Sequence, residues 1–212
     1  MKVISFSLWG SDPKYTVGAI RNAEMVSEYY PDWIARFYCG SSVSDEILKA
    51  IELNKNTEIV SMAEEGNWEG MFWRFLAADS DDIVISRDTD CRFSEREVLA
   101  VESWLNSDKD FHIMRDHPYH GTEILGGMWG CRNGILKGIT DWINQYKKGD
   151  FWQVDQNFLR EEVWPLVHTN CHVHDEFFQK NPFPSPRNPR EFIGKAFNHD
   201  DTECEPTHGD MV

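Results

Sequence analysis

Short apolar runs alternate with longer segments in which apolar residues recur every three or four positions through the first half of the chain. The short runs predict buried strands, and the periodic segments predict amphipathic helices. The strands predicted in this half cover residues 3–8, 34–38, 58–60 and 83–85. The helices predicted between them cover residues 19–30, 44–51 and 68–76. Strands that alternate with helices are typical of a parallel, doubly wound α/β sheet, which binds ligands beyond the carboxyl ends of its strands.

The second half of the chain is less regular. We expect helices at 98–105 and 135–146 and another from residue 151, with strands at 111–114, 124–129 and 171–174. Gly126 and Gly127 interrupt the middle one of these strands. The proline-rich residues 181–190 predict a loop, and the polar residues after 199 predict a poorly ordered tail or a linker within a longer chain. We therefore expect one domain over residues 1–199 and a tail or linker over 200–212.

Length and charge narrow the class of protein. A chain of 212 residues suits a single domain, and its 21 basic and 36 acidic residues leave a net charge of −15. An acidic surface repels phosphate backbones, so nucleic acid is not an expected partner. No apolar run approaches roughly 18 residues, so we expect no transmembrane segment and a cytoplasmic protein. Five dispersed cysteines without a C-x-x-C pair suit a reducing compartment and argue against a thiolate zinc site.

The strongest chemical signal follows the strand at 83–85, where Asp88 and Asp90 stand two residues apart. In an extended chain, alternate side chains point to the same side, so we expect both carboxylates to face one spot. Two like charges about 4 Å apart repel by roughly 4 kcal/mol at an effective dielectric constant near 20, so a cation is expected between them. Carboxylate oxygens favour Mg²⁺ or Mn²⁺. The alternative interpretation is an ordinary surface turn.

Further motifs flank this acidic pair in a particular order. An aromatic–arginine–aromatic segment with Arg74 at its centre precedes the pair, and Gly126-Gly127 and Asp155-Gln156 follow it. Over residues 3–175, this order resembles the GT-A class of nucleotide-sugar glycosyltransferases, including small members from bacteria and large DNA viruses. The resemblance implies a GT-A-like catalytic domain with a mostly parallel sheet, flanking helices and an irregular C-terminal part. It also implies metal-dependent hexosyl transfer from a nucleoside diphosphate sugar, with UDP as the family-level expectation, to a glycan or glycoprotein acceptor.

The resemblance also implies roles for individual residues. Asp88 and Asp90 would bind Mn²⁺ or Mg²⁺ with a late histidine, for which His174 is favoured over His199. Asp155 and Gln156 would lie at the reacting face of the sugar, which favours retention of configuration. An inverting enzyme would instead need a carboxylate base. The residues that would contact the donor are Ser7, Trp9, Tyr15, Arg74, Asp88, Gly126, Gly127 and Lys195.

A charged loop after the strand at 111–114 contains two more candidate binding residues, which its position at a strand end suggests. Asp116 and His117 lie where a strand end meets the ligand-binding face, so we expect them to contact the donor sugar or the acceptor. An ion pair between Arg115 and Asp116 that holds the loop is the alternative. Among the nine tryptophans, most of which we expect in the core, Trp9 and Trp129 are the best candidates for stacking on a sugar.

Two other functions compete with glycosyl transfer. A metal-dependent phosphoesterase or zinc hydrolase could use the histidines together with the aspartates, although neither H-E-x-x-H nor a paired-metal spacing occurs. The histidines concerned are His117, His120, His172 and His174. A sugar-nucleotide domain that binds without catalysing transfer is the third possibility.

Overall fold

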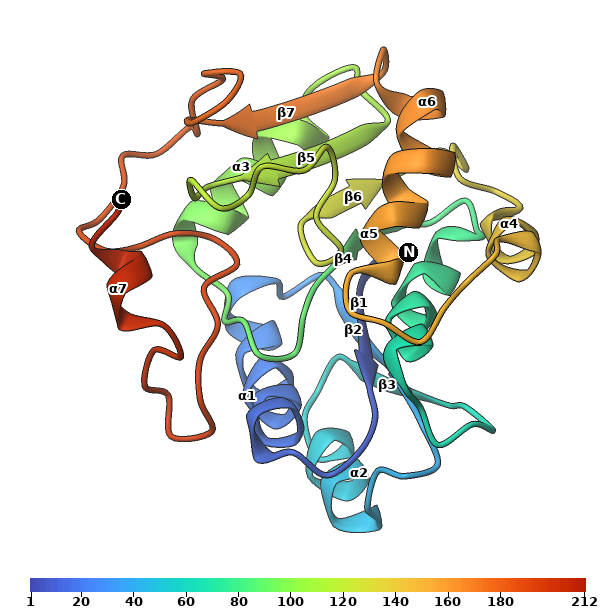
Figure 1. Ribbon diagram of the computed structural model, residues 1–212. Coiled ribbons are helices and arrows are strands. Elements are labelled where there is room, and N and C mark those ends of the chain that lie inside the picture. Colours follow the sequence, from blue (N-terminus) through green and yellow to red (C-terminus); the bar gives the residue numbers. More distant parts are fainter.

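The computed structural model describes residues 1–212, and its centre is one seven-stranded sheet in the order β3-β2-β1-β4-β6-β5-β7 (Figure 1). Only β6 runs antiparallel to its neighbours β4 and β5; all other pairs are parallel. The prediction of a mostly parallel α/β sheet is therefore confirmed. The strands are β1 (Lys2–Leu8), β2 (Ile34–Cys39), β3 (Thr57–Ser61), β4 (Ile83–Ser86), β5 (Phe111–Arg115), β6 (Trp129–Cys131) and β7 (Cys171–Asp175).

Helices cover both faces of the sheet. One core cluster packs α1, α2 and α3 against one face, and a second packs the 3₁₀ helix η1, α4, α5, the π-helical turn η2 and α6 against the other. The short α7 lies in the C-terminal segment. The bounds are α1 (Pro13–Tyr29), α2 (Asp45–Glu52), η1 (Trp68–Ala78), α3 (Glu95–Leu105), α4 (Ile139–Gln145), α5 (Val154–Phe158), η2 (Leu159–Val163), α6 (Trp164–Val167) and α7 (Pro206–Gly209).

Helix α1 begins directly after the loop that leaves β1. The Asp12 side chain accepts a hydrogen bond from the backbone N–H of Lys14 at 2.9 Å, and Pro13 occupies the first turn. Both features favour a helix start, because the cap satisfies a free N–H and proline has none to lose. The cap therefore places Lys14 at the edge of the sheet where β1 ends.

One predicted strand and one predicted site residue differ in the structure. Only the last residue of the predicted strand 124–129 is a strand, and residues before it form a turn in which Met128 N–H donates to the Leu125 carbonyl at 3.2 Å. Gly126 and Gly127 sit in this turn, and the strand β6 begins at Trp129. The Trp129 side chain is fully buried and stacks on Phe111. The prediction that Trp129 stacks on a sugar is therefore wrong.

The long segment after β7 wraps around the body of the protein as a strap, defined here as residues 176–212 (Figure 1). Its last part packs against the domain: Asp201 pairs with Arg92 at 2.9 Å, and the His208 carbonyl lies 3.1 Å from His117 Nε2. The polar tail is thus bound to the body, contrary to the expectation of poor order. A boundary near residue 199 remains a prediction. No helix combines the length and apolar character needed to cross a bilayer.

Candidate functional site

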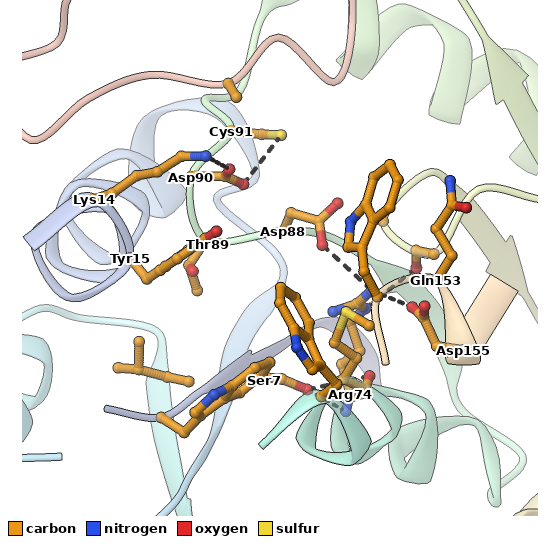
Figure 2. Close-up of a pocket in the computed structure, with 18 of the residues that line it drawn as sticks. Ser7, Lys14, Tyr15, Arg74, Asp88, Thr89, Asp90, Cys91, Gln153 and Asp155 are labelled. Carbon is orange, nitrogen blue, oxygen red and sulfur yellow. Dashed lines mark hydrogen bonds and ion pairs between the residues drawn. The ribbon is translucent and has the colours of Figure 1, made fainter. Parts of the chain in front are cut away.

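The main cavity, of about 740 Å³, lies at the carboxyl ends of β1 and β4. Ligand cavities in proteins typically measure roughly 300–1,000 Å³, and open α/β sheets bind ligands at this edge. Its walls come from the end of β1, the start of α1, η1, the loop after β4, the Gly126–Met128 turn, the start of α5 and the strap. Figure 2 shows the loop after β4 that carries Asp88 and Asp90, called here the acidic loop, with Asp88 turned to Arg74 and Asp90 turned to Lys14.

The two aspartates of the acidic loop do not point to one spot. Strand β4 ends at Ser86, and the chain then turns, with Cys91 N–H donating to the Asp88 carbonyl at 3.2 Å. Asp90 turns to the ammonium of Lys14, which lies 2.9 Å away. Asp88, with 41% of its side chain exposed, turns instead to Arg74 at 3.3 Å (Figure 2). The prediction of same-side carboxylates is wrong here because the extended chain stops before them.

The surroundings of Asp90 nonetheless disfavour the ionised form of its carboxylate. Burial raises the pKa of Asp90 above its ordinary value, and the nearby charge of Asp88 raises it further, while Lys14 opposes both effects. The ionised form is disfavoured because the site removes water and adds a like charge. An additional cation at this loop would relieve both penalties.

Arg74 connects four parts of the site. Its guanidinium donates to Asp155 Oδ2 at 2.8 Å and to the Gly126 carbonyl at 3.2 Å. Its backbone N–H donates to Ser7 Oγ at 2.9 Å, and its carbonyl accepts from Ser5 Oγ at 2.6 Å. The arginine is nearly fully buried, so it fixes η1, β1, the glycine turn and the start of α5 in one arrangement.

Asp155 carries an oxygen that no group of the protein satisfies. Oδ2 is bound by Arg74, but Oδ1 is buried without a hydrogen-bond partner. Burial raises the pKa of Asp155; Arg74 lowers it and Asp88 raises it again. A buried acceptor without a partner is costly, so this oxygen is available to a donor group on a ligand in the cavity.

The Gly126–Gly127 turn is packed too tightly for any side chain. A Cβ on Gly127 would overlap the carboxylate of Asp88, and a Cβ on Gly126 would overlap both Asp155 and Arg74. These glycines therefore let the backbone lie against the charged side chains. The approach of this backbone to a sugar, which the resemblance implies, stays a prediction.

Known proteins resemble this chain in structure but not detectably in sequence. No protein-family model matches the sequence, and no curated protein sequence matches it. Solved structures do match, among them a glycosyltransferase involved in the glycosylation of the major capsid of PBCV-1. That match has 14% identity and a TM-score of 0.52, and it covers 82% of each chain. The chain has the GT-A fold.

Two further matches show the range of proteins with this fold. Glucosyl-3-phosphoglycerate synthase from Mycobacterium tuberculosis, in complex with UDP, matches with 14% identity and a TM-score of 0.53, covering 89% of this chain and 72% of that one. The 4-diphosphocytidyl-2C-methyl-D-erythritol synthase from Anaerococcus prevotii matches with 14% identity and a TM-score of 0.50, covering 88% of this chain and 90% of that one. Because the fold occurs in both, the reaction must be argued from the site.

A divalent cation, which GT-A glycosyltransferases commonly use, fits the residues present. Asp88 and Asp90 offer hard oxygen ligands, and Mg²⁺ or Mn²⁺ needs only one or two carboxylates when phosphates complete its coordination. The cavity is lined by five carboxylates, from Asp12, Asp88, Asp90, Asp150 and Asp155, and by two cationic side chains, Lys14 and Arg74. Both cationic groups are already paired with aspartates. A diphosphate in this cavity therefore needs positive charge from outside the protein.

Most of the predicted site residues line the cavity. They are Ser7, Trp9, Tyr15, Arg74, Asp88, Asp90, Gly126, Gly127, Asp155 and Gln156. Besides Trp129 and the alternative metal ligand His199, four predicted residues do not line it: Asp116, His117, His174 and Lys195. Each of these four has partners elsewhere in the protein.

Asp116 is buried beneath the strap and holds it in place. Its carboxylate accepts two hydrogen bonds of 3.0 Å from Arg96, one of 2.7 Å from Arg187 and one of 3.0 Å from the backbone of Ile193. The alternative prediction, an ion pair that holds the loop, has the right kind of interaction but the wrong partner. Asp116 pairs with Arg96 and Arg187, whereas Arg115 pairs with Asp175 at 2.8 Å. The site role predicted for Asp116 is corrected to a structural one.

His117, Lys195 and His174 are likewise engaged away from the cavity. His117 lies under α7, with Nε2 3.1 Å from the His208 carbonyl. Lys195 pairs with Glu203 at 2.8 Å within the strap. His174 lies on the edge strand β7, which β6 and β5 separate from β4, and its Nδ1 is 2.8 Å from His112 Nε2. The structure therefore does not bring His174 to the acidic loop as a third metal ligand.

The histidines do not form the metal centre that a hydrolase would require. Of the four considered, only His120 lines the cavity. No group of three or more histidine, cysteine, aspartate or glutamate side chains is arranged to hold a metal ion. The hydrolase interpretation is not favoured, and any cation at Asp88 and Asp90 would depend on a ligand for its remaining coordination.

Several residues of the site escaped the sequence analysis. Lys14 had a usable signal, because the Asp12-Pro13 helix start places it beside the end of β1. Trp68 lines the cavity from the first residue of η1, and Trp152 and Gln153 line it from the loop before α5; no motif marks any of the three as a site residue. Only the packing of η1 against the loop before α5 brings them together.

Proposed function

We propose that this protein is a glycosyltransferase that moves a sugar from a nucleoside diphosphate sugar to a hydroxyl group of a glycan. The single observation that carries the proposal is the buried Arg74–Asp155 pair, which lies beside the Gly126–Gly127 turn and also contacts Asp88 of the acidic loop at the cavity. The turn lets backbone approach a sugar, and the free Oδ1 of Asp155 can accept a sugar hydroxyl.

Asp88 and Asp90 would hold Mn²⁺ or Mg²⁺ in this reaction. When bound, the cation supplies the charge that stabilises the departing diphosphate. Arg74 keeps the acidic loop and α5 at a fixed separation through Asp88 and Asp155. The end of β1, with Ser7 and Trp9, and the exposed ring of Tyr15 would receive the nucleoside, for which UDP is the proposed form.

Asp155 and Gln156 would act at the reacting carbon of the sugar. Arg74 and burial both restrict the movement of Asp155, so its carboxylate would stabilise positive charge on the sugar in the transition state. A fixed, ion-paired carboxylate suits this role better than that of a base that must reach an acceptor hydroxyl. We therefore propose retention of configuration, which NMR of the product's anomeric proton would test.

The donor and cation requirements can be tested together by thermal shift. At a hundredfold excess over Kd, a ligand stabilises the folded state by about 2.7 kcal/mol, which corresponds to roughly 5–10 °C for a chain of this size. We expect UDP-sugars to raise Tm only with Mn²⁺ or Mg²⁺, and Asp90→Asn to abolish the shift. Asp81→Asn, which removes an exposed carboxylate outside the cavity, is the control. A shift that persists without metal and in Asp90→Asn would overturn the proposal.

A further inference from the structure

Two tryptophans at the cavity are unusually exposed. Trp152 is 65% exposed and Trp68 is 40% exposed, whereas Trp33, Trp104 and Trp129 are buried in the core. Both exposed rings line the same cavity as the acidic loop. Large aromatic rings rarely remain in water without a binding role when they gather at a cavity.

The backbone that carries these two tryptophans is held in place. The backbone N–H of Trp68 donates to Asp150 Oδ1 at 3.1 Å, which ties the start of η1 to the loop before α5. Gln153 follows Trp152 with a left-handed φ of 70°, a conformation that costs a non-glycine residue on the order of 1 kcal/mol. This turn leads within two residues to Asp155. The position of Trp152 is therefore coupled to that of the proposed catalytic carboxylate.

The polar groups around the rings indicate which ligand would suit them. Asn67, Asp150 and Gln153 line this side of the cavity with amides and a carboxylate. The cavity's cationic side chains, Lys14 and Arg74, are both ion-paired to aspartates. An acceptor that carries phosphate or carboxylate would find no free cation here and would meet uncompensated negative charge.

We propose that Trp68 and Trp152 form an acceptor subsite that selects a neutral sugar and stacks on its apolar face. Asp150 and Gln153 would bind the sugar's hydroxyls, as carboxylates and amides commonly do beside aromatic platforms. The inference rests on the proposed glycosyltransferase function and adds the chemical class of its acceptor. It distinguishes this protein from the structural neighbour that was solved with phosphoglyceric acid.

Saturation-transfer NMR tests the subsite without requiring turnover. The probes are neutral disaccharides (lactose, maltose, cellobiose and mannobiose) and two anionic compounds, 3-phosphoglycerate and glucose 6-phosphate, each with UDP and diamagnetic Mg²⁺ present. We expect transfer to at least one neutral disaccharide and none to the anions. Trp152→Ala and Trp68→Ala should each abolish that transfer, and Trp152→Phe should keep part of it. Phe178→Ala, an exposed aromatic outside the cavity, is the matched control and should change nothing.

Donor binding separates this inference from the function on which it rests. Both tryptophan variants should keep the UDP-sugar thermal shift of the wild type, and the KM for a neutral acceptor should rise at least tenfold in Trp152→Ala. If the wild type shows no donor shift at all, the proposed function fails. If the donor shift is normal, the subsite is overturned by transfer only to the anions, by no transfer to any disaccharide, or by unchanged transfer in both variants.

Discussion

Removing the Arg74 guanidinium should destabilise the whole protein as well as the site. In Arg74→Ala, the buried Asp155 loses its only charged hydrogen-bond partner, and the Gly126 carbonyl loses a donor. Breaking a buried ion pair from one side typically costs about 3–5 kcal/mol, because the remaining charge stays buried without compensation. For a protein of this size, that loss corresponds to a fall in Tm of roughly 6–20 °C.

The origin of the loss can be separated by pH and by a second substitution. Without Arg74, burial would raise the pKa of Asp155 further, so the folded variant would bind a proton that the unfolded chain releases above its ordinary pKa of 3.8. The folded state then gains protons as pH falls, so the stability difference from wild type should be smaller at pH 5 than at pH 7.5. The double variant Arg74→Ala/Asp155→Asn should be more stable at pH 7.5 than Arg74→Ala alone, because no charge remains unpaired.

Urea unfolding followed by tryptophan fluorescence at both pH values measures these free energies. The double-mutant cycle should give a coupling energy above about 2 kcal/mol between the two positions. A loss of less than about 1 kcal/mol in Arg74→Ala, or a stability difference independent of pH, would show that Arg74 does not support the fold through Asp155. Arg21→Ala, which removes an exposed arginine from the surface of α1, is the control and should change stability little.

Three further outcomes follow from the structure. Burial lowers the pKa of His174 to about 4 and that of His112 well below its ordinary 6.5, so only the unfolded chain takes up these protons at mildly acid pH. The free energy of unfolding should therefore fall between pH 6.5 and 4, and urea titrations should show a shallower fall in His174→Gln. Gly127→Ala would push a methyl group into Asp88, so calorimetry should show at least tenfold weaker binding of UDP with Mn²⁺; unchanged affinity would contradict the close packing of the turn. Lys14→Met removes the cation that neutralises the second aspartate of the acidic loop, so Mn²⁺ alone should bind more tightly; equal or weaker binding would show that the lysine does not compete for that carboxylate.

Local sequence patterns predicted much of the fold because they report local physics. Apolar runs such as residues 83–85 are buried wherever they lie in a sheet, and the helix predicted to end at residue 30 ends at Tyr29. Helix α1 nevertheless begins at Pro13 rather than at the predicted residue 19, because the Asp12 cap and Pro13 favour the earlier start. The same reasoning placed Asp88 and Asp90 at the carboxyl end of β4, which is the edge where the cavity lies. The sequence therefore predicts which segments are helices or strands, and at which edge of the sheet the ligand cavity lies.

Contacts between distant segments decided the rest of the site. Trp129 is buried because β6 lies between β4 and β5 in the middle of the sheet, and His174 is remote because β7 lies at the edge. The residues of β6 and β7 do not by themselves indicate where each strand lies in the sheet.

The sequence by itself therefore determined the α/β class, most of the elements and ten of the residues that line the cavity. Tertiary structure alone decided that Asp116 holds the strap through Arg96 and Arg187, and that Asp90 turns to Lys14 rather than to Asp88. The physical reason is that a charged side chain takes its partner from whatever the fold brings within about 3–4 Å, and the segments it meets lie far away along the chain.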